Sequence, residues 1–132
     1  VAEHGWKVRE ICVDPWNATQ FAIELQKRGY TVVEITQGIR TLSLPTKDLR
    51  ERVLKGQVIH DGSPVLTWAM GNAIERSDHN GNIMLDKQKS RERIDPVAAL
   101  MNAHARAMHH EMGNAYDPNR YATEDILSKI WG

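Results

Sequence analysis

Two aspartates stand directly before prolines, at positions where a carboxylate could hold a metal ion. Asp14 ends a short apolar run, and Asp95 opens an alanine-rich run. Hard divalent cations prefer oxygen ligands, and two ions about 3.5–4 Å apart can stabilise both the attacking and the leaving oxygen when a phosphodiester is cut. A structural interpretation stays open for each residue, since Asp14 could simply form a turn and Asp95 could cap a helix.

Three further groups carry polar chemistry. His60 and Asp61 follow a short extended segment and could line a site, although Asp61 before a glycine is also typical of a turn. Asp78 lies close to an Asn-Gly pair, where aspartate is again a common turn residue. The polar connector 87–93 concentrates cations that could contact phosphate or simply be solvated: Lys87, Lys89, Arg91 and Arg93. The histidines show no zinc-ligand spacing.

The residues around Asp14 predict a strand, a helix and a second strand. Residues 9–13 are rich in β-branched side chains and end at Pro15, which disfavours a continuing ladder. Asn17 could cap a helix that runs to about residue 28, with Gln20 as its capping-box partner and Phe21, Ala22 and Leu25 on its apolar face. A strand over 30–35 would complete a parallel crossover unit.

The remaining elements follow from caps, turns and periodicity. Residues 36–45 are expected to be loop. A helix is expected over 47–55, with Leu49, Val53 and Leu54 on one face. A second helix is opened by Ser63 and Pro64, and its apolar face carries Val65, Leu66, Trp68 and Ala69. A β-hairpin over about 73–87, an alanine-rich helix from Asp95 to about Met112 lying on the sheet, and a short helix over 124–131 capped by Thr123 complete the expected elements.

Composition excludes several classes of protein. The 132 residues include 17 basic and 17 acidic side chains, so no global positive field marks a nucleic-acid binder, although a local patch is enough for one. No apolar run approaches membrane-spanning length, and no signal peptide is evident. The single Cys12 rules out an internal disulfide and favours a reducing compartment. Because Val1 is not preceded by methionine, we expect a fragment.

Several segments in a fixed order resemble the large subunit of the terminase of tailed bacteriophages, in its carboxy-terminal nuclease domain. These segments are the strand followed by DPWNA, the loop containing Gln37-Gly38, and the stretches VLKGQVIHDGSPVLTWAMGNAIERSD and GNIMLDKQKSRERIDPVAAL. The similarity covers residues 1 to about 108. It implies a partial ribonuclease H-like α/β fold, with a central mixed sheet, flanking helices and an added hairpin. Residues 1–132 would be one domain, with a terminal extension over 113–132.

The resemblance implies a Mg²⁺- or Mn²⁺-dependent endonuclease that cuts double-stranded DNA during genome packaging. Asp14 would match the acid on the strand before the middle helix, Asp95 the acid that opens the last helix, and Asp78 an acid in the hairpin region. The family's first acid and its ATPase motor would lie upstream of Val1, so this fragment is expected to keep only part of the metal site. The open alternative is a non-catalytic remnant or a docking module of the packaging machinery.

The resemblance also implies partners and a geometry. Double-stranded DNA, other terminase and portal components and a second copy of the chain are the expected partners, in the cytoplasm of a bacterial host. The connector 87–93 is the expected contact to phosphate. If Asp14 and Asp95 share a metal site, their carboxyl groups should lie within roughly 4–8 Å of each other.

Overall fold

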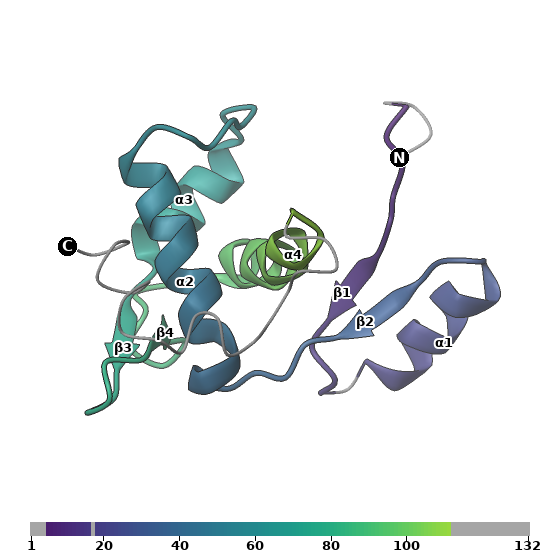
Figure 1. The fold of residues 1–132 in the computed structure, drawn as a ribbon, viewed down its shortest axis with the longest axis horizontal. Coiled ribbons are helices and arrows are strands. Elements are labelled where there is room, and N and C mark those ends of the chain that lie inside the picture. Colours follow the sequence, from purple (N-terminus) through teal and green to yellow (C-terminus); the bar gives the residue numbers. More distant parts are fainter. Residues whose placement is uncertain (1–4, 17, 112–132) are drawn as a thin grey trace. The chain divides into compact units, whose positions relative to one another are not determined.

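The computed structural model describes residues 5–16 and 18–111, and the chain divides into two compact units, Val1–Gln37 and Gly38–Gly132. The fold is α/β, as predicted (Figure 1). The elements in chain order are β1 (Ile11–Val13), α1 (Thr19–Lys27), β2 (Val32–Glu34), α2 (Ile39–Leu54), α3 (Pro64–Asn72), β3 (Glu75–Ser77), β4 (Ile83–Leu85) and α4 (Asp95–Glu111).

The first unit is the predicted strand–helix–strand crossover. β1 and β2 pair in parallel, with Ile11 opposite Val32 and Val13 opposite Glu34. Such a pair needs a crossover connection, which α1 supplies (Figure 1). Gly29 follows the helix with a φ of 88°, a left-handed conformation that glycine adopts without steric cost.

Two details of α1 differ from the sequence-based expectation. Ala22 is buried, but Phe21 is 57% exposed, because α1 packs on a short strand pair that covers only a narrow stripe of the helix. The expected cap Asn17 lies outside the described residues. Ala18 precedes the helix and provides no side-chain cap, and Gln20 bonds to Glu24 within the helix.

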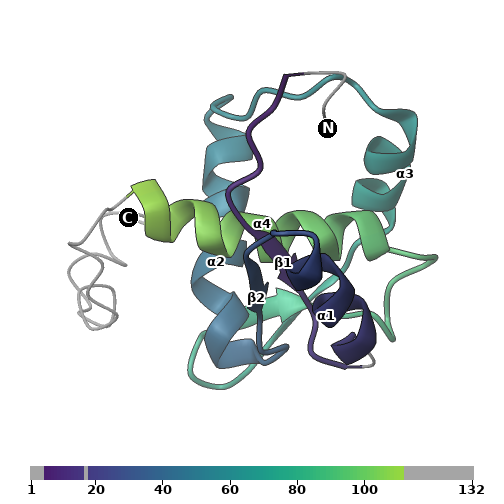
Figure 2. The ribbon, with the colours of Figure 1, turned by 90° about the vertical axis from the view of Figure 1, so that its right-hand side faces the viewer.

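The second unit is built around contacts of α4 with α2 and α3, and of α2 with β4. Figure 2 shows α4 crossing α2 at a steep angle. The alanine-rich helix therefore packs on helices in its own unit, where the sequence suggested a sheet. The apolar core of this unit consists of Leu42, Leu49, Ala69, Ile94, Val97, Met101 and Met108.

The prediction that residues 36–45 form a loop is wrong, because α2 already begins at Ile39 and carries Pro45 in its interior. Pro45 removes one helical hydrogen bond, but it is buried and the helix continues through it. Thr46, expected to be a cap, instead donates its hydroxyl to the carbonyl of Leu42 at 2.6 Å. Ser43 accepts a hydrogen bond from the Ile83 backbone at 3.1 Å and so ties α2 to the hairpin.

Two local predictions in the second unit are confirmed. β3 and β4 form an antiparallel hairpin, with Ser77 opposite Ile83 and Gly81 in a left-handed conformation at the turn. Ser63 caps α3 by accepting a hydrogen bond from the Leu66 backbone at 3.4 Å, ahead of Pro64. The described strands thus form one parallel and one antiparallel pair. None of the described helices is long and apolar enough to cross a lipid bilayer.

The predicted apolar faces of α2 and α3 are only partly buried. Leu49 and Ala69 lie in the core, whereas Val53 and Leu54 are 51% and 75% exposed. On α3, Val65 and Trp68 are also largely exposed. The periodicity therefore identifies both helices, but it overestimates how much of each apolar face the unit covers. The expected helix over 124–131 lies outside the described residues.

Candidate metal site and basic connector

Asp14 directly follows β1, the position at the carboxyl end of a strand where open α/β sheets place their ligands. Its Oδ1 atom accepts a hydrogen bond from the Trp16 backbone at 2.9 Å. Pro15 stands between the two residues and fixes the turn. The half-buried carboxylate is therefore held by the backbone at the end of the strand, a rigid setting for a ligand oxygen. Its role as a metal ligand stays a prediction.

Asp95 is the first residue of α4, and its side chain is exposed. The carbonyl of Ile94 accepts the first helical hydrogen bond, from the Ala98 backbone at 2.9 Å, so Ile94 occupies the N-cap position. Among the described residues the Asp95 carboxylate has no hydrogen-bond partner. The helix dipole still favours a negative charge here. Asp95 is thus not a hydrogen-bonding cap, and its carboxylate is exposed in the first turn of α4.

Asp78 organises the turn of the hairpin. Its Oδ1 accepts hydrogen bonds from the backbones of Asn80 and Asn82, both at 2.9 Å, and its Oδ2 accepts one from the Asn82 amide at 2.9 Å. The Asn82 side chain and the two backbone donors lower the pKa of Asp78 below its ordinary value. This turn role is enough to explain the residue, and its catalytic assignment stays a prediction.

His60 and Asp61 shape the loop before α3. The Gly62 backbone donates to His60 Nδ1 at 3.1 Å, and the Ser63 backbone donates to Asp61 Oδ1 at 3.0 Å. Gly62 has a φ of 75°, which completes the expected turn. Both side chains are exposed and engaged with their own loop. They have a local structural function whether or not they also line a site.

The basic connector, residues 87–93, starts from a buried aspartate that the sequence did not single out. Asp86 is 8% exposed and accepts hydrogen bonds from the backbones of Gln88 and Lys89, both at 3.0 Å. Ser90 bonds back to the Asp86 carbonyl through its backbone and its hydroxyl. The connector is therefore a hydrogen-bonded turn that holds four exposed cations: Lys87, Lys89, Arg91 and Arg93.

Replacing Asp86 with alanine should lower the free energy of unfolding by about 1.5–3 kcal/mol, because two backbone donors lose a charged acceptor. Asparagine keeps one acceptor oxygen, so Asp86→Asn should cost clearly less. Urea denaturation of both variants measures the difference. Equal stability of wild type and Asp86→Ala would show that the carboxylate does not hold the turn.

A three-residue cluster joins α2 to α4 and was also missed by sequence analysis. Asp48 Oδ2 lies 2.7 Å from His104 Nε2 and accepts a 2.7 Å hydrogen bond from Arg52 Nε. Burial alone would raise the pKa of Asp48, but the hydrogen bonds from His104 and Arg52 and the charge of Arg52 outweigh it and lower the pKa. The spacing of Asp48 and Arg52 by four residues is a visible signal, whereas nothing in the sequence identifies His104 as their partner.

The predicted site residues divide between the two units: Asp14 lies in the first, and Asp78 and Asp95 lie in the second. Their chemistry fits Mg²⁺ or Mn²⁺, which take carboxylate oxygens. Within residues 5–16 and 18–111, no group of three or more His, Cys, Asp or Glu side chains is close enough together to hold a metal ion. The described residues thus offer suitable donors, and the 4–8 Å separation of Asp14 and Asp95 stays a prediction.

Residues 1–111 match the family described as the terminase large subunit, endonuclease domain, and the chain belongs to this family. It is 35% identical over 89 residues to the terminase large subunit of Enterobacteria phage HK97, covering 66% of this chain and 18% of that protein. It is also 31% identical over 106 residues to protein YmfN of Escherichia coli K12, covering 79% of this chain and 23% of that protein.

A solved structure supports the same assignment. The crystal structure of the HK97 bacteriophage large terminase superimposes with a TM-score of 0.69 at 29% identity, covering 79% of this chain and 22% of that one. The chain therefore spans less than a quarter of the length of each of these relatives. Its α/β architecture is that of part of a terminase large subunit.

Proposed function

We propose that this chain is part of a divalent-metal-dependent endonuclease that cuts double-stranded DNA during phage genome packaging. The match of residues 1–111 to the terminase endonuclease family is the observation that carries the proposal. Other terminase and portal components are the partners proposed with it, in the cytoplasm of the bacterial host. The identity of 35% to a phage terminase large subunit supports the same assignment.

Asp14 and Asp95 are the proposed ligands of Mg²⁺ or Mn²⁺. A bound divalent ion would polarise the phosphodiester and lower the pKa of a bound water. The Trp16 backbone orients the Asp14 carboxylate through its 2.9 Å hydrogen bond, so little side-chain freedom would be lost on binding. Asp95 contributes an exposed carboxylate from the first turn of α4. Each ligand thus comes from the end of a regular element, which holds it more precisely than a loop would.

Calorimetric titration of the chain with Mn²⁺ tests this function. We expect saturable binding at or below millimolar Mn²⁺ by the wild type and loss of that binding in Asp14→Ala. Glu24→Gln is a matched control, because it removes an exposed carboxylate of the same unit that is not a proposed ligand. Absence of Mn²⁺ binding by the wild type, or unchanged binding by Asp14→Ala, would favour a non-catalytic docking module over a nuclease.

The basic connector is the proposed contact to the DNA backbone. Its four cations are exposed, and among the described residues no ion pair neutralises them. Each phosphate contact releases condensed counterions, which makes affinity fall with salt. A second feature suits this role: Asp86 fixes the connector's backbone, so less entropy is lost on binding.

The double variant Arg91→Gln/Arg93→Gln should bind duplex DNA more weakly. The slope of the logarithm of the binding constant against the logarithm of the salt concentration should become shallower by up to about 1.8, because each of two lost phosphate contacts accounts for about 0.9. Lys27→Gln/Arg28→Gln removes the same charge from the end of α1 and is the control. Fluorescence anisotropy between 50 and 200 mM salt, roughly the range over which such contacts are lost, gives both slopes. Identical slopes for the connector variant and the wild type would rule out these contacts.

A further inference from the structure

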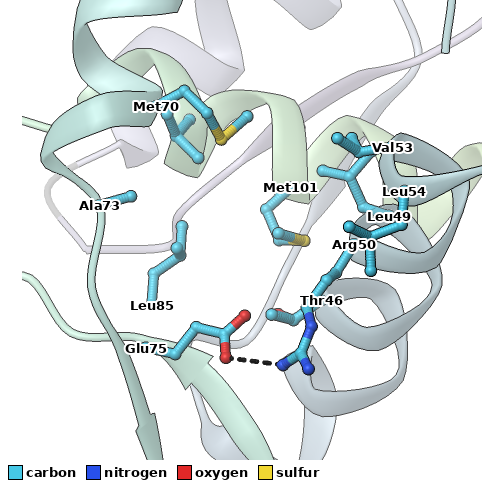
Figure 3. A pocket seen from close by; sticks show the side chains of 11 residues that line it. Thr46, Leu49, Arg50, Val53, Leu54, Met70, Ala73, Glu75, Leu85 and Met101 are labelled. Carbon is cyan, nitrogen blue, oxygen red and sulfur yellow. Dashed lines mark hydrogen bonds and ion pairs between the residues drawn. The ribbon is translucent and has the colours of Figure 1, made fainter. Parts of the chain in front are cut away.

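The second unit contains an apolar pocket of about 210 Å³, and neither Asp14 nor Asp95 is among its lining residues. Its wall is formed by α2, α3, the hairpin and α4, and includes Leu49, Val53, Leu54, Met70, Leu85 and Met101. Figure 3 shows these side chains around an open space, with the 3.1 Å ion pair between Arg50 and Glu75 at one margin.

The rim of this pocket leaves much apolar surface in water. Leu54 is 75% exposed, Val53 is 51% exposed and Met70 is 40% exposed. All three line the pocket, so the exposed side chains adjoin an apolar concavity. An apolar groove with an exposed apolar rim is the surface into which an amphipathic helix docks.

We propose that the carboxy-terminal segment of the same chain, residues 123–131, docks into this pocket. Residues 112–132 follow α4 and lie beyond the family match, which ends at residue 111. In this segment apolar residues recur at the spacing of one helix face: Ile126, Leu127, Ile130 and Trp131. The segment therefore carries the side chains that such a pocket accepts.

The connection is long enough for this docking. Met101 lines the pocket, and α4 ends ten residues later at Glu111, about 15 Å farther along the helix. The intervening residues 112–122 can span up to about 40 Å when extended. The chain can therefore return from the end of α4 to the pocket without strain.

The volume of the pocket also suits this segment. A volume of 210 Å³ exceeds the ~150 Å³ cavity that accommodates a benzene ring, so it has room for side chains such as Ile130 or Trp131.

Methionine methyl NMR on the full chain tests the proposal, because two of its five methionines line the pocket, Met70 and Met101. Met84 and Met108 do not line it and are internal references. We expect Ile130→Asp to shift the Met70 and Met101 methyl signals and to leave those of Met84 and Met108 in place. Ser128→Asp adds the same charge between the apolar residues and should shift none of the four.

A substitution on the pocket side tests the same contact independently. Leu54→Lys should shift the Met70 and Met101 methyl signals, and adding Ile130→Asp to it should not increase these shifts further. The control Ile59→Lys changes a residue that is 99% exposed and outside the pocket, and it should leave the Met70 and Met101 signals unchanged. Unchanged Met70 and Met101 signals in Ile130→Asp would overturn the proposal. It would equally be overturned if these signals changed with protein concentration, because the occupant would then be a second copy of the chain.

Discussion

Asp95→Asn should weaken Mn²⁺ binding by at least ~100-fold, because even loss of a residue that only supports a metal ligand can weaken metal binding by that much. The stability of the metal-free fold should change by no more than about 1 kcal/mol. Asparagine cannot supply the negative charge that the cation requires. In the metal-free protein, removing the charge forfeits a small interaction with the helix dipole. It also relieves repulsion from Asp14 if the two carboxylates share a site.

Calorimetry and urea denaturation on the same samples measure the two effects of Asp95→Asn separately. Glu92→Gln is the matched control, because it removes an exposed carboxylate three residues before α4. If Asp95 only stabilised the start of the helix, asparagine would change neither quantity appreciably. Unchanged Mn²⁺ affinity in Asp95→Asn would therefore remove this residue from the metal site.

Asp48→Asn should lower the free energy of unfolding by about 1.5–3 kcal/mol at neutral pH, because two hydrogen bonds lose their charged acceptor. The pKa of Asp48 is lowered in the folded chain by His104 and Arg52, against the effect of burial, from an ordinary value of 3.8. The stabilisation by ionised Asp48 is therefore complete above that value and is lost as the pH falls through the lower folded pKa.

The pH dependence of unfolding distinguishes this account of Asp48 from simple loss of packing. The stability difference between wild type and Asp48→Asn should be present at pH 7 and should shrink as the pH falls below about 3.8. Chemical denaturation at a series of pH values measures it. A difference that persists at acid pH would show that the charge of Asp48 contributes nothing to the junction of α2 and α4.

The parts of the fold that sequence predicted correctly are those with local signals. The parallel unit follows from β-branched strands and the stop at Gly29, and the hairpin follows from Asn80-Gly81. The start of α2 was missed because Pro45 normally breaks a helix, whereas here it is buried within one. Burial in the tertiary structure outweighed the local preference.

Side-chain partners were predicted less well than elements. His104 and Asp48 are 56 residues apart in sequence, and no periodicity connects them. Asp86 was missed because its importance comes from the backbone donors that fold around it. For Asp14 and Asp95, local rules gave the strand end and the helix start correctly, but the distance between their carboxylates depends on long-range packing that no local signal encodes.

The most direct test of the proposed function is the anomalous diffraction of Mn²⁺ in crystals of the full chain grown with the metal. The account predicts one Mn²⁺ peak with oxygens of both Asp14 and Asp95 at about 2.0–2.6 Å. The two carboxyl groups would then lie roughly 4–8 Å apart or closer. A metal bound without either residue would contradict this account. Carboxylates more than about 12 Å apart would also contradict it, because they would be too far apart to bind the same ion.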